Sequence, residues 1–303
     1  MWNRTMKKLA IFTLLILLIL FINPYGSDAA PDISAEKAVV LDMNTMEVLY
    51  GKQMNERSSI ASITKIVTAF VALEYGDLDH RVRISKKASM MEGSSIYTKE
   101  NQLYTLEDLI YGLMLRSGND AATAIAEHVG GSVEGFAFLM NETADWIGME
   151  NSSFKNSHGL EEENHYSSAY DMALITAHAM NENDQFKKIF GTEKHLPKNG
   201  DYYWFNKNKL LTTYGEYCTG GKTGFTKKAG RTLVTTAEYE DQAIVVVTLN
   251  ASDDWNDHKK LYDYAFQELA KKPNVPIQAE ANQSNLFDLY IETFRQLQGA
   301  SVW

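Results

Sequence analysis

The stretch SSIASITKIVTAF, residues 58–70, has the composition of a helix that lies inside a protein. Apolar residues between Ile63 and Phe70 follow the i, i+3, i+4, i+7 spacing of one helical face, and their neighbours leave almost no polar face. Yet the stretch also carries Ser62 and Lys65, three positions and therefore about one turn apart. We expect a helix buried nearly all round, with Ser62 in its first turn beside Lys65.

A serine and a lysine in this arrangement can form a nucleophile and its base. Burial disfavours the charged form of lysine, so the pKa of Lys65 should fall and its neutral amine can accept the proton of Ser62. The pattern SxxK alone decides little, because it occurs three times, starting at residues 34, 62 and 152. A lone lysine on an apolar helix commonly reaches past it to solvent.

Two further motifs distinguish the copy at Ser62. SGN, residues 117–119, is the only SxN in the chain, and KTG, residues 222–224, is the only KTG. Ser117 follows a predicted helix end, where it can relay a proton to a leaving amine, and the amide of Asn119 can hold Lys65. The motifs are separated by 55 and 105 residues.

The segment TGGKTGF, residues 219–225, predicts a strand edge that a peptide backbone can join, since glycines flank Lys222 and Thr223. Lys222 offers positive charge to a substrate carboxylate, and Thr223 offers a hydroxyl. Gly224 keeps the strand open to a close approach. The backbone N–H groups of Ser62 and Phe225 are the predicted oxyanion donors.

The order of predicted elements indicates one sheet with a helical insertion. Alternating residues predict a hairpin over residues 37–51, and two more strands cover residues 230–239 and 242–251. Helical patterns fill the middle and the end, at residues 105–117, 119–129, 132–147, from 168, and 257–272. We therefore predict an α+β fold, in which an antiparallel sheet is flanked by helices, a helical lobe rises from it, and the active site lies in the cleft between them.

The N-terminal segment predicts export. Residues 1–29 place three basic residues before a 14-residue apolar run and a small-residue stretch, the layout of a cleaved signal peptide, with an uncleaved anchor as the alternative. The formal net charge is −10 for all 303 residues and −12 without this segment, which makes nucleic acid an unsuitable partner. The single cysteine, Cys218, excludes an intramolecular disulfide.

The rest of the chain divides into a catalytic domain and a tail. We predict the domain over residues 30–271, a linker over 272–285 and an amphipathic helix over 286–303. Asp288 and Glu292 stand against Arg295 in this helix, whereas helices that lie on membranes are usually rich in basic residues. Peripheral membrane contact, packing on the domain and self-association all stay open for it.

With these motifs, residues 35–270 resemble the low-molecular-mass penicillin-binding proteins, specifically serine-type D-alanyl-D-alanine carboxypeptidases of peptidase family S11. The segments NSHGLEEENHYSSAYDMA and GGKTGFTKKAGRTLV are also similar to that family's sequences. The resemblance implies the β-lactamase/transpeptidase-like fold and a Ser62 acyl-enzyme formed on peptidoglycan stem peptides that end in D-Ala-D-Ala. It implies acylation by β-lactams, no metal or organic cofactor, and work at the outer face of the cytoplasmic membrane or in the cell wall.

The chain departs from the resemblance in two places. Many relatives carry a second, β-rich domain and a membrane anchor, whereas only about 30 residues follow Lys272 here. Several relatives also bind the terminal carboxylate with an arginine near the final helix, and the matching segment, ASDDWNDHKK, has none. Lys222 and Thr223 are therefore the only carboxylate ligands that the sequence suggests.

Four other functions fit less well. A β-lactamase would need a deacylating carboxylate between SGN and KTG, where residues 161–163 are glutamates but no ExxLN pattern occurs. The segment GEYCTGGKT misses the phosphate-binding spacing by one residue. A metal hydrolase would need clustered ligands, and the seven histidines are scattered. A binding protein without activity would usually have lost a motif residue, and all three motifs are intact.

Overall fold

The computed structural model describes residues 30–198 and 200–272, and all of these except residues 30 and 31 belong to the unit Asp32–Trp303. The predicted signal segment, residues 1–29, and the predicted C-terminal helix, residues 286–303, lie outside the described residues. So does all of the predicted linker except Lys272.

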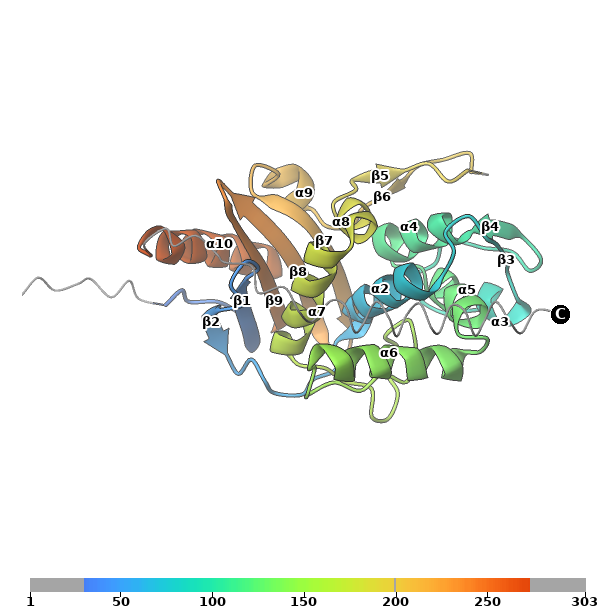
Figure 1. Ribbon diagram of the computed structural model, residues 1–303, viewed down its shortest axis with the longest axis horizontal. Helices are drawn as coiled ribbons and strands as arrows, with labels where there is room; N and C mark the ends of the chain where they lie inside the picture. The colour runs from blue at the N-terminus through green and yellow to red at the C-terminus, as the bar shows by residue number, and fades with distance from the viewer. Residues whose placement is uncertain (1–29, 199, 273–303) are drawn as a thin grey trace, which may run out of the picture. The chain divides into compact units, whose positions relative to one another are not determined.

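A five-stranded antiparallel sheet forms the base of the fold, in the order β2-β1-β9-β8-β7 (Figure 1). The first strand along the chain pairs with the last, so that Val39 lies opposite Val247. This pairing confirms the prediction that the terminal strands share one sheet. The strands are β1 (Lys37–Asp42), β2 (Val48–Lys52), β7 (Cys218–Thr226), β8 (Gly230–Tyr239) and β9 (Gln242–Ala251).

Each face of the sheet has its own apolar core. Because side chains alternate along a strand, Val39 and Leu41 enter one core while Ala38 and Val40 enter the other. Helix α7 (Ala169–Glu182) packs on the first face and α10 (Asp254–Ala270) on the second. Helix α10 begins three residues before the predicted start, where acidic residues suit the positive end of the helix dipole.

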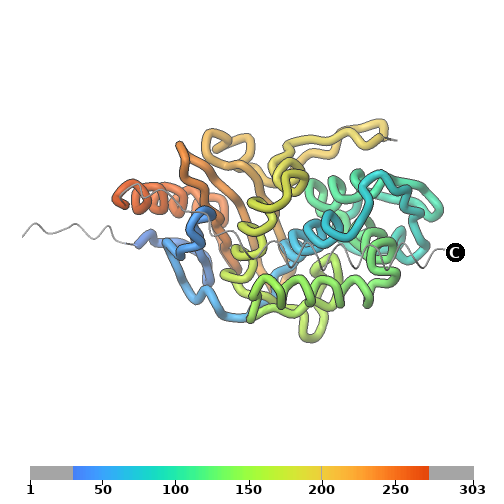
Figure 2. Tube along the Cα trace, in the orientation of Figure 1, coloured from blue at the N-terminus to red at the C-terminus, as the bar shows by residue number. Residues whose placement is uncertain are grey.

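The chain leaves the sheet after β2, builds the helical lobe, and returns at β7 (Figure 2). The predicted helix starts are confirmed at two caps: Thr105 Oγ1 accepts from the N–H of Asp108 at 3.1 Å, and Ser168 Oγ from that of Asp171 at 3.0 Å. The described residues include no helix long and apolar enough to cross a membrane. The remaining helices and short strands are α3 (Lys86–Ser89), α4 (Leu106–Arg116), α5 (Asn119–Val129), α6 (Val133–Ile147), α8 (Asp184–Phe190), α9 (Leu210–Thr213), β3 (Arg81–Arg83), β4 (Leu103–Thr105), β5 (Lys194–His195) and β6 (Trp204–Phe205).

The stretch that holds Ser62 and Lys65 differs from the prediction at its start. A 3₁₀ turn, η1 (Ala61–Thr64), precedes the α-helix α2 (Lys65–Tyr75), so Ser62 lies in the 3₁₀ turn and not in the first turn of the α-helix. The predicted burial is confirmed, since every residue of α2 except Glu74 is buried. Side chains three apart lie nearly in line in a 3₁₀ turn, so Ser62 and Lys65, which directly follows the turn, point to the same side.

Candidate active site

Ser62 and Lys65 form a hydrogen-bonded pair. The Nζ of Lys65 lies 3.1 Å from the Oγ of Ser62, and the lysine is fully buried. Burial, followed by the charge of Lys207, lowers the pKa of Lys65 to about 7. Near neutral pH this amine is therefore unprotonated in a large fraction of molecules.

Two more acceptors hold Lys65 in place. Its Nζ donates to Oδ1 of Asn119 at 2.8 Å and to the backbone oxygen of His158 at 2.5 Å. A neutral amine has two N–H groups and one lone pair. With both N–H groups bound to Asn119 and His158, the lone pair is left for the hydroxyl hydrogen of Ser62.

The loop that supplies the His158 oxygen has a tightly fixed backbone. Gly159 has φ +83°, and a Cβ there would lie 2.0 Å from the backbone oxygen of Ala61. The side chain of Asn156 accepts from the N–H of Gly159 at 2.8 Å, and a ring nitrogen of His165 lies 3.0 Å from Thr64 Oγ1. The sequence analysis did not predict a contact between this segment and Lys65.

Ser117 and Lys222 form a second pair, although 105 residues separate them. The Nζ of Lys222 lies 3.0 Å from the Oγ of Ser117 and 2.8 Å from the backbone oxygen of Thr223. Burial, followed by the charges of Lys65 and Lys207, lowers the pKa of Lys222. Ser117 ends α4 with φ +63°, a left-handed conformation that costs a non-glycine residue energy and turns its hydroxyl toward the lysine.

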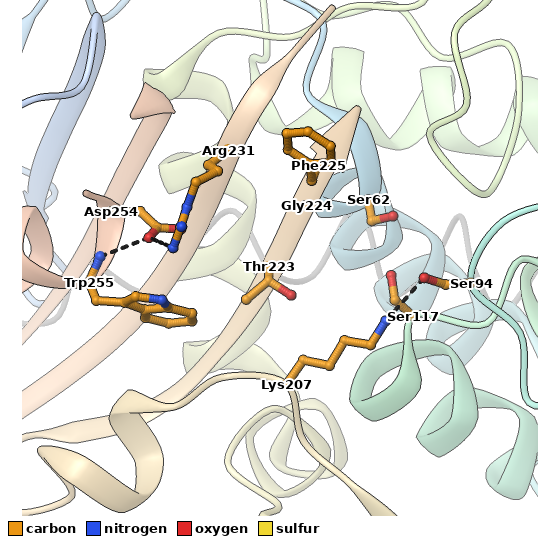
Figure 3. A pocket seen from close by; sticks show the side chains of 10 residues that line it. All are labelled: Ser62, Ser94, Ser117, Lys207, Thr223, Gly224, Phe225, Arg231, Asp254 and Trp255. Atoms are coloured by element: carbon orange, nitrogen blue, oxygen red, sulfur yellow. Dashed lines mark hydrogen bonds and ion pairs between the residues drawn. The ribbon is translucent and has the colours of Figure 1, made fainter. Parts of the chain in front are cut away.

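A pocket of about 500 Å³ opens beside both serines (Figure 3). Ser62, Ser117, Thr223, Gly224 and Phe225 line it, so five of the predicted site residues share one cavity. Lys222 and Lys65 stand behind it, bonded to the two serines. The remaining lining residues are Ser94, Lys207, Arg231, Asp254 and Trp255.

Strand β7 approaches η1 closely at the glycine of KTG. A Cβ on Gly224 would lie 2.4 Å from Thr232 Oγ1 and 2.9 Å from the backbone nitrogen of Ser62. Only glycine therefore lets this strand lie against the turn that carries the nucleophile. Within the described part of the chain, β7 is the last strand in the order of the sheet, so its outer edge can pair with an extended peptide.

Sequence reasoning missed two cations in the pocket. Arg231 on β8 is paired with the buried carboxylate of Asp254 at the start of α10, and its side chain is 42% exposed. Lys207 precedes α9, and its Nζ donates to Ser94 Oγ at 3.0 Å. Arg231 stands seven residues after Gly224, within the segment GGKTGFTKKAGRTLV, a position that could have drawn attention to it.

Residues 26–253 match the D-alanyl-D-alanine carboxypeptidases of peptidase family S11. The chain belongs to this family. D-alanyl-D-alanine carboxypeptidase DacF of Bacillus subtilis is 36% identical over 250 residues, which cover 79% of the chain and 64% of DacF. DacA of Escherichia coli K12 is 34% identical over 254 residues, which cover 77% of the chain and 62% of DacA. The chain thus spans less than two thirds of either relative.

Solved structures of the family share the fold. The D-alanyl-D-alanine carboxypeptidase of Mycobacterium tuberculosis H37Rv superposes with a TM-score of 0.76 at 29% identity, covering 85% of this chain and 99% of that one. A mutant of the Streptomyces K15 DD-transpeptidase gives a TM-score of 0.74 at 30% identity, covering 78% and 100%. These matches confirm both the family and the fold that the sequence predicted.

The described residues can be searched for side chains that cluster as metal ligands do. Across residues 30–198 and 200–272, no three histidine, cysteine, aspartate or glutamate side chains gather in a way that could hold a metal ion. The histidines of the HGLEEENH loop have other contacts, because the Nδ1 of His158 accepts from the N–H of Leu160 and that of His165 from the N–H of Lys155. The reactive groups that the fold gathers at this site are serines and lysines.

Proposed function

We propose that this protein is an exported serine D-alanyl-D-alanine carboxypeptidase that removes the last D-alanine from peptidoglycan stem peptides. One observation carries the proposal: a fully buried lysine, whose pKa is lowered to about 7, lies 3.1 Å from a serine that opens into the pocket. Such a lysine can take the serine's proton near neutral pH, as a general base must.

The first half of the reaction forms an acyl-enzyme. Lys65 takes the hydroxyl proton of Ser62, and Ser62 Oγ bonds to the carbonyl carbon between the two D-alanines. The backbone N–H groups of Ser62 and Phe225 are the proposed donors to the resulting oxyanion. Ser117, backed by Lys222, gives its proton to the leaving nitrogen and is reprotonated by the proton that Lys65 took from Ser62, so D-alanine departs and Lys65 is neutral again.

In the second half, water resolves the acyl-enzyme. Lys65, neutral again, takes a proton from water, the hydroxide bonds to the ester carbonyl, and Lys65 returns that proton to Ser62 Oγ as the ester bond breaks. A β-lactam would follow the first half with its ring amide as the broken bond, so the leaving nitrogen stays attached. We therefore expect β-lactams to remain bound to Ser62 as slowly hydrolysed esters.

Recognition of the terminal carboxylate is assigned to Thr223 and Arg231. Both line the pocket, and Asp254 holds the guanidinium of Arg231 in place. Lys222 is buried behind Ser117 and bonds to the hydroxyl of that serine, so it can act on the carboxylate only from behind the pocket wall. Arg231 thus fills the place that the sequence had left without an arginine near the last helix.

The proposal also covers the parts of the chain on either side of the site. Residues 1–29 would direct export and residues 30–271 would form the catalytic domain, at the outer face of the cytoplasmic membrane or in the cell wall. A linker over residues 272–285 and a helix over 286–303, with peripheral membrane contact among its uses, would follow. No cofactor has a part in the proposed reaction.

Mass spectrometry tests the proposal directly. Incubation with benzylpenicillin should add one adduct, on the peptide that contains Ser62, and a synthetic pentapeptide ending in D-Ala-D-Ala should release D-alanine. Ser62→Ala should abolish both. An adduct on another residue, rapid turnover of the penicillin, or transfer of the acyl group to an added amine in preference to water would each contradict the assignment.

A further inference from the structure

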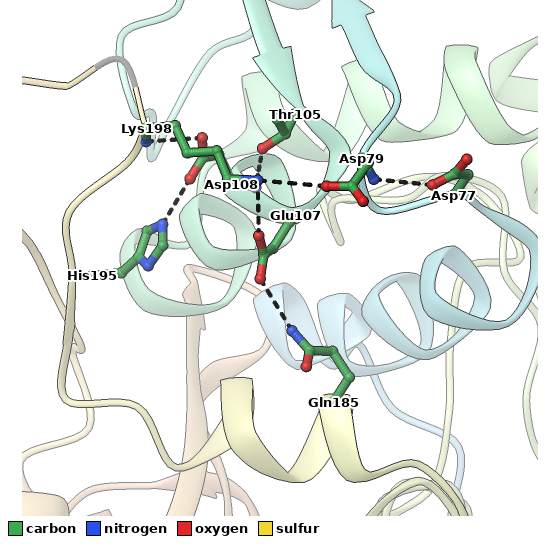
Figure 4. A network of polar contacts seen from close by, with 8 residues as sticks. All are labelled: Asp77, Asp79, Thr105, Glu107, Asp108, Gln185, His195 and Lys198. Atoms are coloured by element: carbon green, nitrogen blue, oxygen red, sulfur yellow. Dashed lines mark hydrogen bonds and ion pairs between the residues drawn. The ribbon is translucent and has the colours of Figure 1, made fainter.

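The hairpin formed by β5 and β6 has an inner face anchored on helix α4. The ring of His195 stacks on Tyr111 with centroids 3.8 Å apart, and its Nε2 lies 2.7 Å from Oδ1 of the buried Asp108 (Figure 4). Trp204, directly opposite His195 in the hairpin, is only 2% exposed. The inner face is therefore part of the folded core of the lobe.

The anchor is reinforced by charge. Burial alone would raise the pKa of Asp108, but hydrogen bonds from His195 and the N–H of Lys198 hold it below its ordinary value. The Nζ of Lys198 lies 3.4 Å from a carboxylate oxygen of Glu107 and 3.6 Å from one of Asp79. The hairpin is thus held in one position, and its outer face is presented in a fixed geometry.

The outer face exposes large apolar side chains. Tyr203 and Phe205 are 48% and 59% exposed, with ring centroids 6.4 Å apart, and Leu196, directly after β5, is 45% exposed. The Nζ of Lys194 lies 5.2 Å from the ring centre of Tyr203. We call these four residues the aromatic face of the hairpin. Exposed clusters of this kind mark interaction surfaces, because single exposed apolar residues are ordinary but groups are not.

The aromatic face leads into the pocket. Phe205 precedes Lys207 by two residues, so their Cα atoms are at most about 7 Å apart. Lys207 lines the pocket beside Ser94 and Ser117. A molecule that fills the pocket and extends past Lys207 toward β6 would come within reach of Phe205.

We propose that the aromatic face binds the glycan strand to which the stem peptides are joined. Sugar rings have apolar C–H faces that stack on aromatic rings, and hydroxyls that suit the phenol of Tyr203 and the ammonium of Lys194. An anionic bilayer suits this face less well, because the protein has a net charge of −10 and Lys198 is committed to carboxylates of its own chain. The inference rests on the proposed function, since it concerns the same substrate.

Two substrates distinguish the contribution of the pocket to activity from that of the aromatic face. One is a free pentapeptide ending in D-Ala-D-Ala, and the other is a soluble glycan chain bearing the same pentapeptide. For the double variant Tyr203→Ala/Phe205→Ala we expect kcat/KM on the glycan-linked peptide to fall about tenfold, mostly through KM, since each stacked aromatic contributes modestly. Release from the free peptide should not change.

Phe138→Ala is a matched control, since Phe138 is 59% exposed, like Phe205, but lies on α6 and not in the hairpin. It should leave kcat/KM unchanged on both substrates, and the melting temperatures of all variants should agree. An equal loss on both substrates, or no loss on either, overturns the proposal.

Direct binding makes the test independent of activity. Peptide-free glycan chains should bind the wild-type protein in a calorimeter and should not bind the double variant. If wild type releases no D-alanine from either substrate, the proposed function fails while this binding still decides the inference. If the wild type floats with anionic vesicles and the double variant does not, the aromatic face binds a bilayer. If the wild type forms a dimer in sedimentation velocity and the double variant does not, the face binds a second copy. Either result overturns the proposal that it binds glycan.

Discussion

The protein contains two serine–lysine pairs, each with a buried lysine, that look alike and are built differently. Ser62 and Lys65 lie 3.1 Å apart within one turn of chain, and Ser117 and Lys222 lie 3.0 Å apart across 105 residues. Lys65 also donates to acceptors on a helix and on a distant loop, whereas Lys222 also donates to the oxygen of Thr223, its neighbour on the same strand. The comparison suggests different tasks, a base for the first pair and a proton donor for the second.

Replacing each lysine should separate these tasks most strongly. Lys65→Ala should slow acylation by benzylpenicillin by about 10⁴-fold or more, since nucleophile and base act as a unit. Lys222→Ala should slow it by about 10²- to 10³-fold, the usual contribution of one acid or base. Stopped-flow or mass-spectrometric acylation rates measure both. If Lys222→Ala has the larger effect, the two roles are assigned the wrong way round.

The loop acceptor of Lys65 can be disturbed with a matched pair of glycine variants. Gly159 and Gly148 both have positive φ, +83° and +88°, but only at Gly159 would a Cβ meet other atoms, 2.0 Å from the Ala61 oxygen. Gly148→Ala should cost about 1–2 kcal/mol of unfolding free energy from backbone strain, and Gly159→Ala should cost more, because its Cβ would also meet backbone atoms. Only Gly159→Ala should also slow acylation, by about tenfold, because the His158 oxygen moves from Lys65. Equal acylation rates for the two variants would show that the loop with His158 has no part in acylation.

The smallest expected effect concerns pH. Lys65 acts as an unprotonated base with a pKa of about 7, so acylation should slow tenfold per unit below that pKa and level off above it. Lys207→Ala removes a nearby positive charge that helps to lower this pKa, so the midpoint of the profile should move to higher pH. Lys207→Arg keeps the charge and should keep the midpoint. If the midpoint is the same in all three proteins, the charge at residue 207 does not affect the pKa of Lys65.

The same shift affects stability, with a definite sign. The pKa of Lys65 is lowered from 10.5 to about 7 by folding, so between these values the unfolded chain binds more protons than the native one. The contribution of this residue to the free energy of unfolding therefore rises with pH through that window and is unfavourable below it. The site keeps a dry lysine at a cost in stability, which fits a functional group better than a structural one.

Local patterns in the sequence predicted much of the fold. The periodicity of residues 58–70 predicted a buried helix, the caps at Thr105 and Ser168 predicted two helix starts, and alternation predicted the hairpin at residues 37–51. These features depend on neighbours a few residues apart, so the sequence carries them directly. The 3₁₀ turn at Ser62 was not predicted. It begins at Ala61, which has φ +50°, a conformation that is rare for alanine and that the sequence therefore does not indicate.

By itself the sequence determined which chemical groups the site contains and that Ser62 and Lys65 are neighbours, because three residues of chain fix that spacing. Only the tertiary structure decided that Lys222 backs Ser117, that the His158 oxygen completes the surroundings of Lys65, and that Arg231 enters the pocket. Each of those contacts joins segments whose separation along the chain is large. Their distances depend on how the sheet and the helical lobe pack, and no local spacing of residues encodes that packing.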